Sequence, residues 1–430
     1  MEGNDMALID YKPMMERCSN CSFCKWIPLD KIKSVRYAEN CPSVTFRGWN
    51  ANSARGRFQM GLAVVNGELE YTDKMAEITR ECLACGACDV SCKICRYNLE
   101  PLEYAVALKA DAVEKGCAIP EQKRAVENLA AEKTMLDGNK KAGRGLWAEG
   151  LPLVDAFREK ADVIFFPGCR YSYDGSSPDA PARQALRGAI ELLDKCGVKV
   201  GRLGEADACC AGRAWQMGFF AQFKVQAERN IEAIRKTGVG TVVTPCSDCR
   251  HALNRLYGPL GRDFDVLHIS EYLEKLIAAG KISFTKKLDM TVTYHDPCHL
   301  GRQGEPYIPW EGREGKILNQ VAVWNPARPR YNGAHGIYDA PRNIIKSIPG
   351  VRLAEMERIR EYSWCCGAGG GCSDTAPEFS KWTAAERLDE AASTGADFLI
   401  TACPWCKHNF DSAPGGVGTM DIIELALKAL

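Results

Sequence analysis

The later part of this chain contains the same cysteine pattern twice, and this repeat limits the folds that are open to it. Each copy has a lone cysteine after a strand-like run, then two adjacent cysteines, then a C-x-x-C motif. The first copy consists of Cys169, Cys209, Cys210, Cys246 and Cys249, and the second of Cys298, Cys365, Cys366, Cys403 and Cys406. Because clustered thiolates bind iron–sulfur clusters or zinc, five thiols in one repeated arrangement predict two metal sites of the same kind.

The sequence around these cysteines repeats as well. TGVGTVVTPCSDCRHAL (237–253) aligns with TGADFLITACPWCKHNF (394–410), and the adjacent-cysteine pairs stay in register with these segments. The leading cysteine lies farther from its pair in the second copy, so that copy contains an insertion. Residues 303–335, rich in Pro, Trp, Arg and Asn, are the candidate for an inserted loop.

Within each copy, short apolar runs alternate with helical patterns. Strand-like runs cover 161–166, 241–244, 290–295 and 398–401, and helical patterns cover 182–196, 220–236 and 378–392. Alternating strands and helices predict an α/β fold, which places its ligands at the carboxyl ends of the strands. We expect an N-terminal module at 1–100, a helical connector at 101–160 and two tandem, similar α/β cysteine-rich domains at 161–286 and 287–430.

The N-terminal module contains two cysteine runs of ferredoxin type. Cys82, Cys85, Cys88 and Cys92 have the bacterial ferredoxin spacing, and Cys18, Cys21 and Cys24 form a second triplet, completed by Cys41 before Pro42. In two-cluster modules the fourth cysteine of each run binds the other cluster. We therefore expect an α-rich, ferredoxin-like module with two cubane [4Fe–4S] clusters, one on Cys18, Cys21, Cys24 and Cys92, the other on Cys82, Cys85, Cys88 and Cys41.

Two departures from the ferredoxin motif follow Cys92. Lys93 stands where the motif has proline, and Cys95 is close enough to compete with Cys92 as the ligand. Zinc knuckles are the alternative to iron–sulfur clusters, since zinc also binds C-x-x-C thiolates. A zinc site seldom needs three thiols at this spacing followed by a fourth, so the pattern favours iron–sulfur clusters.

Composition restricts which compartment and which classes of partner we expect. The chain has 430 residues and 22 cysteines, and Lys plus Arg (55) balances Asp plus Glu (55), so nothing indicates nucleic acid as a partner. No apolar run approaches the ~18 residues needed to cross a bilayer, and the N-terminal sequence lacks an apolar signal core. We expect a cytoplasmic protein without direct membrane insertion, whose reduced thiols bind metal.

Three segments of the second copy carry a family resemblance. HDPCHLGR (295–302), YDAPRNIIKSIPGVRLAEMERIRE (338–361) and CCGAGGG (365–371) closely resemble the D-type heterodisulfide reductase family of iron–sulfur oxidoreductases. That family has paired cysteine-rich (CCG) domains and includes the iron–sulfur subunit of ATP-independent (class II) benzoyl-CoA reductase complexes. The resemblance covers nearly the whole chain, and it implies that each five-cysteine set binds a noncubane [4Fe–4S] cluster.

The resemblance implies an oxidoreductase and leaves two roles open. The first is an iron–sulfur electron-transfer subunit of a soluble complex, which moves electrons between the cubanes and the noncubane clusters for flavin-containing or reductase subunits. The second is a catalytic subunit that reduces a (hetero)disulfide at the paired noncubane clusters. No G-x-G-x-x-G follows a strand, which favours dependence on partners. The first role is favoured because no membrane segment appears and the insertion departs from the disulfide pattern.

Glycines and histidines beside the cysteines are further candidate site residues. Gly212, Gly367 and Gly369 lack a Cβ, so the backbone can approach a bulky cluster and its N–H groups can reach sulfur. His295 and His299 flank Cys298 and can donate a proton to a departing thiolate or a hydrogen bond to sulfide. The alternative for both is a structural role as hydrogen-bonded histidines.

Overall fold

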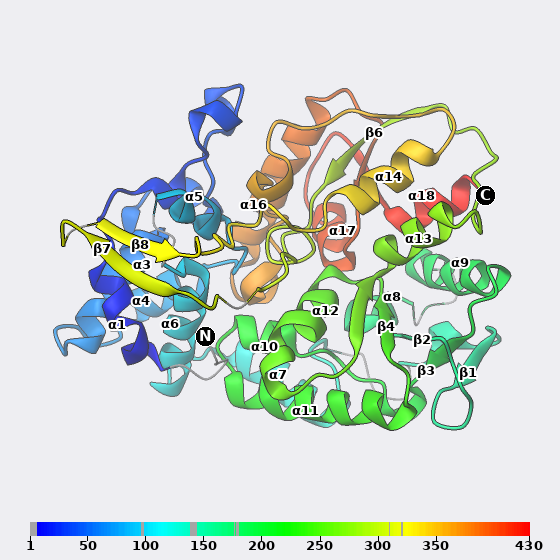
Figure 1. Cartoon of the computed structure of the whole chain (residues 1–430), viewed down its shortest axis with the longest axis horizontal. Helices are drawn as coiled ribbons and strands as arrows, with labels where there is room; N and C mark the ends of the chain where they lie inside the picture. The colour runs from blue at the N-terminus through cyan, green and yellow to red at the C-terminus, as the bar shows by residue number, and fades with distance from the viewer. Residues whose placement is uncertain are drawn as a thin grey trace.

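The computed structural model describes residues 7–95, 99–137, 144–175, 177, 180–308, 310–319 and 321–430. The N-terminal module lies at one end of the molecule, and the two α/β domains lie beside each other at the other end (Figure 1). Within the described residues, no helix is both long and apolar enough to cross a membrane.

Short helices build the N-terminal module and the connector. They are α1 (Lys12–Glu16), α2 (Pro42–Arg47), α3 (Ala54–Val65), α4 (Asp73–Arg80), α5 (Ala87–Cys95), α6 (Pro101–Glu114) and α7 (Pro120–Glu132). Each of α2, α6 and α7 begins with proline. The N–H at the first helical position has no partner within the helix, so proline costs no hydrogen bond there. Tyr104 of α6 is fully buried and stacks on Phe58 of α3 with ring centroids 4.4 Å apart, which joins the two helices. The expected α-rich module is confirmed.

Five parallel strands form the sheet of the first cysteine-rich domain, in the order β1-β3-β2-β4-β5. They are β1 (Leu153–Asp155), β2 (Val163–Phe165), β3 (Val200–Arg202), β4 (Thr241–Thr244) and β5 (Asp265–His268). The helices are α8 (Gly168–Asp174), α9 (Pro181–Lys195), α10 (Gly212–Gln216), α11 (Phe220–Thr237), α12 (Ser247–His251) and α13 (Ile269–Ala278). β1 lies within 101–160, where we expected only helices, because three residues are too few to show a strand period.

Four parallel strands form the second sheet, in the order β11-β10-β6-β9. They are β6 (Met290–His295), β9 (Val351–Leu353), β10 (Phe398–Thr401) and β11 (Gly418–Asp421). The helices are α14 (Asp339–Ser347), α15 (Cys372–Thr375), α16 (Pro377–Ala392), α17 (Pro404–Asp411) and α18 (Ile422–Lys428). The spatial order of these strands repeats the order β5-β4-β2-β3 of the first sheet, so the two tandem α/β domains expected from the sequence are confirmed.

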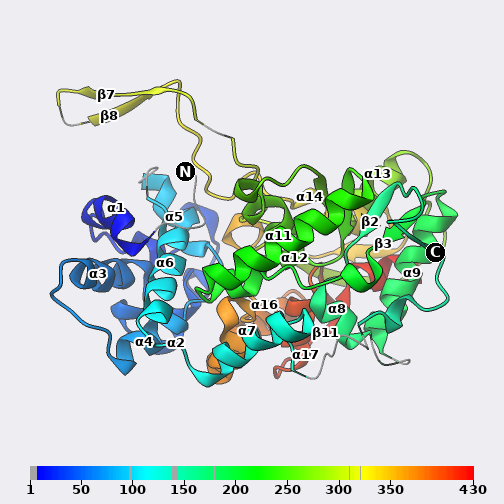
Figure 2. The same cartoon turned by 90° about the horizontal axis from the view of Figure 1, so that it is seen from below.

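The predicted insertion contains an antiparallel hairpin of β7 (Arg313–Ile317) and β8 (Val321–Asn325). It projects from the body on the side of the N-terminal module (Figures 1 and 2). All of β7 is exposed, and Leu318 in the turn is 86% exposed. The insertion therefore adds a separate arm to the molecule and leaves the second sheet unchanged.

A buried group of ions fixes α16 against the segment that follows β9. Glu390 accepts a hydrogen bond from Arg387 (Nη1 to Oε2, 2.7 Å) and another from Arg358 (Nε to Oε2, 2.9 Å). None of the three residues is more than 2% exposed. Charges buried this deeply are tolerated only when they are paired, so each member of the group requires the others.

Replacing Glu390 by glutamine is expected to lower the free energy of unfolding by about 3–5 kcal/mol, because two guanidinium groups would remain buried without a counter-charge. Anaerobic chemical denaturation followed by circular dichroism measures the loss. Glu232→Gln is the matched control, since Glu232 pairs with Lys236 on the exposed surface of α11. The control is expected to unfold like the wild type, and equal losses in both variants would contradict the role assigned to burial.

Candidate metal centres at the domain junction

The cysteine-bearing loops of the two α/β domains meet at the carboxyl ends of their parallel strands. Cys246 follows β4 and Cys403 follows β10, the corresponding strands of the two sheets. Ser247 Oγ donates a hydrogen bond to the carbonyl of Ala402 at 2.7 Å, which ties the two loops together. The sites therefore lie at the edge where α/β folds place their ligands.

The ten thiols of the two repeated sets form a continuous series. In the first set, each thiol affects the pKa of the next along Cys169, Cys209, Cys210, Cys249 and Cys246. In the second set the same holds along Cys298, Cys365, Cys366, Cys406 and Cys403. Cys403 likewise affects the pKa of Cys246, so the two sets meet at their C-x-x-C motifs. The structure thus brings together all five members of each predicted set.

The second cysteine of each adjacent pair lies at the centre of its set. Hydrogen bonds from Cys209 and Cys249 lower the pKa of Cys210 to about 5. Hydrogen bonds from Cys365 and Cys406 likewise lower the pKa of Cys366 to about 6. In both cases the hydrogen bonds outweigh burial, which acts in the opposite direction. Since the thiolate is the form that binds metal, both positions suit a metal ligand.

Backbone N–H groups face sulfur in the same way in both copies. The N–H of Ala211 donates to Cys209 Sγ at 3.4 Å, and the N–H of Gly367 donates to Cys365 Sγ at 3.5 Å. Hydrogen bonds of this kind orient metal-ligating thiolates and stabilise their negative charge. The thiol sets and their N–H donors therefore fit an iron–sulfur cluster.

The three predicted glycines make room for different neighbours. A Cβ on Gly212 would lie 3.7 Å from Cys210 Sγ, so Gly212 borders the thiols. Gly367, at φ +89°, and Gly369 lie against backbone instead of thiols. A Cβ on Gly367 would lie 2.2 Å from the carbonyl oxygen of Ser380, and a Cβ on Gly369 would lie 2.3 Å from that of Leu83. The glycine-rich run thus also lets the N-terminal module approach, and cluster binding by these glycines stays a prediction.

The two predicted cubane sets are also brought together in the N-terminal module. Burial raises the pKa of Cys92, and the nearby charges of Asp89, Cys24, Cys18 and Cys21 raise it further. A small cavity of about 30 Å³ is bordered by the other set, Cys41, Cys82, Cys85 and Cys88. The side chain of Cys95 lies outside the described residues, so the choice between Cys92 and Cys95 as the ligand stays a prediction.

The contacts of Lys93 explain why lysine stands where the ferredoxin motif has proline. Its ammonium group lies 3.2 Å from Asp89 Oδ2 and 2.5 Å from Glu100 Oε2, and it donates to the carbonyl of Tyr331 at 3.1 Å. Burial alone would lower the pKa of Lys93, but the two carboxylates raise it. Lys93 therefore joins the N-terminal module to the end of the insertion, a contact that proline could not make.

The second predicted cubane set touches the second cysteine-rich domain. The thiol of Cys365 raises the pKa of its neighbour Cys85, and Arg302 Nε donates to the carbonyl of Cys85 at 2.7 Å. Lys109, fully buried in α6, donates to the carbonyls of Cys82 at 2.6 Å and Gly370 at 3.0 Å. Sequence reasoning missed Lys109, although a single lysine in the apolar run AVALKADAV was the available signal.

His295 and His299 lie in different environments although both are buried. His299 Nδ1 lies 2.7 Å from Asp248 Oδ1; burial lowers the pKa of His299, but the carboxylate outweighs burial and raises it. For His295, burial lowers the pKa to about 3, and the charge of Arg387 acts in the same direction. Asp248 was missed from the sequence, although an acidic residue between the two cysteines of a C-x-x-C motif was a usable signal.

A cavity of about 800 Å³ lies beside the thiol-bearing loops, where the three parts of the chain meet. Its walls include Lys93, Glu103, Trp215, His251, Arg302 and Gln303. Among the described residues, Trp215 Nε1, His251 Nε2 and Gln303 Oε1 are buried without a hydrogen-bond partner. Leaving such atoms unpaired is costly, so this wall suits a polar ligand that supplies the missing partners.

Known proteins match both kinds of module. The cysteine-rich domain family matches residues 163–254 and 327–411, and the 4Fe-4S dicluster domain family matches residues 14–94. These domains, with their gathered thiols, define an iron–sulfur oxidoreductase.

Several curated proteins are similar over most of this chain. The D-type subunit of the dihydromethanophenazine:CoB–CoM heterodisulfide reductase of Methanosarcina mazei is 31% identical over 83% of this chain and 80% of that protein. Its counterpart in Methanosarcina acetivorans is 30% identical over 97% of this chain and 94% of that protein. One subunit of the fumarate reductase (CoM/CoB) of Methanothermobacter marburgensis is 28% identical over 80% of this chain and 60% of that protein. The chain belongs to the D-type heterodisulfide reductase family, as its motifs predicted.

Replacing Asp248 by asparagine is expected to remove a pH-dependent part of the stability. The raised pKa of His299 means that its protonated form stabilises the fold below about pH 6.5, the ordinary histidine value, and that this contribution is lost as the pH rises through the folded pKa. Asparagine keeps a hydrogen-bond acceptor but removes the charge. Anaerobic calorimetry should therefore show a larger deficit of the variant below this pH than above it.

Asp263→Asn is the control for that experiment, because Asp263 forms an exposed ion pair with Arg235. Asp263→Asn is expected to change the stability little, and by the same amount below and above about pH 6.5. A deficit of Asp248→Asn that is the same at both pH values would contradict the pairing with a protonated His299.

Proposed function

We propose that the chain is the iron–sulfur electron-transfer subunit of a multi-subunit oxidoreductase complex of the heterodisulfide reductase type, such as a benzoyl-CoA reductase complex. The two ferredoxin sets would hold two cubane [4Fe–4S] clusters, and the two repeated sets would hold two noncubane [4Fe–4S] clusters. When bound, these groups supply one-electron transfer. The rest of the proposal concerns how the chain arranges their ligands.

One observation carries this proposal: an unbroken series of neighbouring thiols from the N-terminal module to the far domain. It leads from Cys85 to Cys365, through the second set to Cys403, and from there to Cys246 and the first set. Cys21 of the remaining set is exposed. This arrangement supports a route that begins near the surface of the N-terminal module and ends in the first cysteine-rich domain.

The relatives of this chain and its cysteine content support a proposal for the partners and the compartment. The proteins that resemble this chain are named as subunits of reductases, which supports partner subunits here. We propose flavin-containing or reductase subunits as the partners, and the cytoplasm as the compartment, because a chain with 22 cysteines, most of them used as ligands, requires a reducing environment. The domain boundaries we propose are 1–100, 101–160, 161–286 and 287–430, with β1 added to the first sheet.

A second function has an observation in its favour. The cavity of about 800 Å³ brings a polar wall close to the loops that carry the two repeated sets. This supports binding of a (hetero)disulfide there and its reduction at the paired noncubane clusters, in which two electrons and two protons convert one disulfide into two thiols. His299, with its raised pKa and its contact to Asp248, is the residue that we would assign to hold a proton for a departing thiolate.

Anaerobically purified chain is expected to contain about 16 irons, four in each of four clusters. In the variant Cys85→Ser the content should fall to about 12, because one cubane loses a ligand. Cys117→Ser is the matched control, since Cys117 belongs to neither the ferredoxin sets nor the repeated sets, and its iron content should not change. Zinc as the main metal in the wild-type protein would contradict the proposal.

The two functions are separated by turnover of the isolated chain. An electron-transfer subunit should accept electrons from reduced viologen, seen as bleaching of its iron–sulfur absorbance, without multiple turnovers of a coenzyme heterodisulfide. A disulfide reductase should oxidise viologen continuously when that heterodisulfide is added. Rapid turnover by the isolated chain that is lost in His299→Gln would replace the first proposal by the second.

A further inference from the structure

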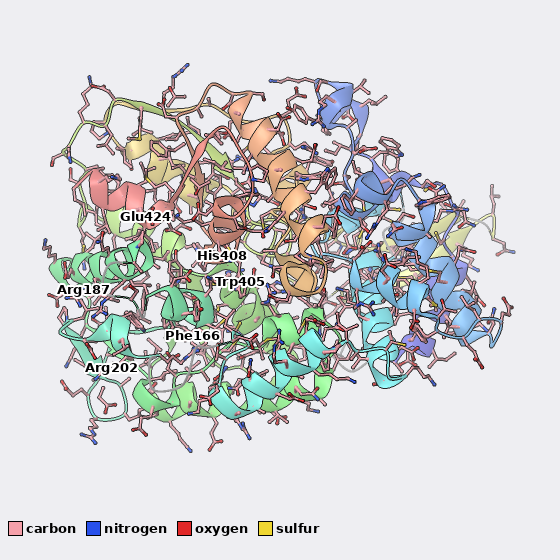
Figure 3. The ribbon with its side chains drawn as sticks, turned by 180° about the vertical axis from the view of Figure 1, so that it is seen from behind. Phe166, Arg187, Arg202, Trp405, His408 and Glu424 are labelled. Carbon is pink, nitrogen blue, oxygen red and sulfur yellow. The ribbon has the colours of Figure 1, made fainter. Side chains whose placement is uncertain are left out.

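One position beside the cysteines differs in chemical kind between the two domains. Phe166 follows β2 and His295 ends β6, the corresponding strands of the two sheets. Each lies three residues before the leading cysteine of its set. Both side chains are buried, and Phe166 is labelled in the first domain in Figure 3. The first domain therefore has a ring without a polar group where the second has an imidazole.

The position of the proton on His295 follows from its neighbour. Arg387 Nε donates a hydrogen bond to His295 Nδ1 at 3.2 Å. A guanidinium group is always protonated and can only donate, so Nδ1 must present its lone pair. Because only the other ring nitrogen can then carry a hydrogen, the ring is neutral. A neutral ring with a lone pair on Nδ1 carries its hydrogen on Nε2.

The N–H that this leaves belongs to a ring that lies beside two cysteine sulfur atoms. His295 Nε2 is buried and has no hydrogen-bond partner among the described residues. A ring nitrogen of His295 and the Sγ atoms of Cys366 and Cys406 all lie within 4.8 Å of one another. Because Nδ1 is bonded to Arg387, Nε2–H is the donor that remains for this sulfur group.

We propose that His295 donates its Nε2–H to sulfur of the cluster bound by the second cysteine set and thereby raises the reduction potential of that cluster. The inference rests on the proposed function, because it assumes an iron–sulfur cluster on Cys298, Cys365, Cys366, Cys403 and Cys406. Reduction makes a cluster more negative, so a hydrogen bond to its sulfur stabilises the reduced state. Phe166 has no N–H, so the first set lacks this donor at the corresponding position.

Arg387 is the positioning residue of this arrangement. It is fully buried, and it is held by Glu390 (Nη1 to Oε2, 2.7 Å) and by Ser363 (Nη2 to Oγ, 3.1 Å). A fixed guanidinium keeps Nδ1 unprotonated, which prevents Nε2 from offering a lone pair to iron. His295 is therefore a hydrogen-bond donor and neither an iron ligand nor the proton donor that we considered from the sequence.

The location of this bond gives it a consequence for electron transfer. The second set is the one whose Cys365 contacts Cys85 of the N-terminal module. A higher potential at the second set favours movement of electrons from the N-terminal module into the cysteine-rich domains. His295 thus acts at the step between the two kinds of module.

A redox titration of the holoprotein followed by electron paramagnetic resonance tests the inference. In His295→Phe, which copies the first domain, the midpoint potential of the second noncubane cluster should fall. A tenfold change in its ratio of oxidised to reduced forms corresponds to a fall of about 59 mV. His295→Gln should restore most of the potential, because its amide can accept from Arg387 and donate to sulfur. Phe166→Leu is the matched control and should leave the second cluster unchanged.

A second measurement needs no substitution. In wild-type protein labelled with ¹⁵N-histidine, pulsed electron paramagnetic resonance should detect a weakly coupled nitrogen and an exchangeable proton near the cluster. Strong nitrogen coupling would show direct ligation to iron and overturn the inference. An unchanged potential in folded, iron-replete His295→Phe would also overturn it while leaving the proposed function intact, whereas a wild-type protein without iron would overturn both.

Discussion

Cys246 and Cys403 are neighbours where the carboxyl ends of two parallel sheets meet, and the arrangement of the domains depends on what these thiols bind. Burial raises the pKa of Cys246, and a hydrogen bond to Cys209 together with burial raises the pKa of Cys169. Because metal binding deprotonates thiols and links the segments that carry them, cluster assembly and domain association are coupled in this chain.

Buried cations connect the same junction to its surroundings. Arg213 donates to the carbonyl of Ala368 at 2.9 Å, and its guanidinium lies 3.8 Å from the ring centroid of Trp405. Lys109 and Arg302 likewise donate to backbone carbonyls of cysteines in the N-terminal module. Arg213 is also paired with Asp374 at 2.8 Å. A buried charge without a counter-charge is very costly, so the negative charge of bound clusters would stabilise Lys109 and Arg302. The charges therefore favour the same assembled state as the thiols.

The sequence was sufficient to predict the parts that depend on local pattern. The strand-like runs predicted at 241–244, 290–295 and 398–401 have the same bounds as β4, β6 and β10. Short apolar runs rich in β-branched residues are typical of buried strands. β1 could not be predicted, since its three residues are defined only by pairing with β3. The roles of Lys93, Asp248 and Lys109 were missed for a related reason, because they depend on partners that lie far away in the sequence and that only the folded chain brings close.

Duplication supplied two similar thiol sets, and the residues around them have since become different. His295 and His299 of the second domain correspond in position to Phe166 and Arg170 of the first. His299 pairs with Asp248 across the junction, whereas Arg170 pairs with Asp174 in its own helix at 2.7 Å. The second set adjoins the N-terminal module through the contact of Cys365 with Cys85. Two identical sites could pass electrons equally well in either direction. The differences in hydrogen bonding and charge around the thiols are what can give the route a direction.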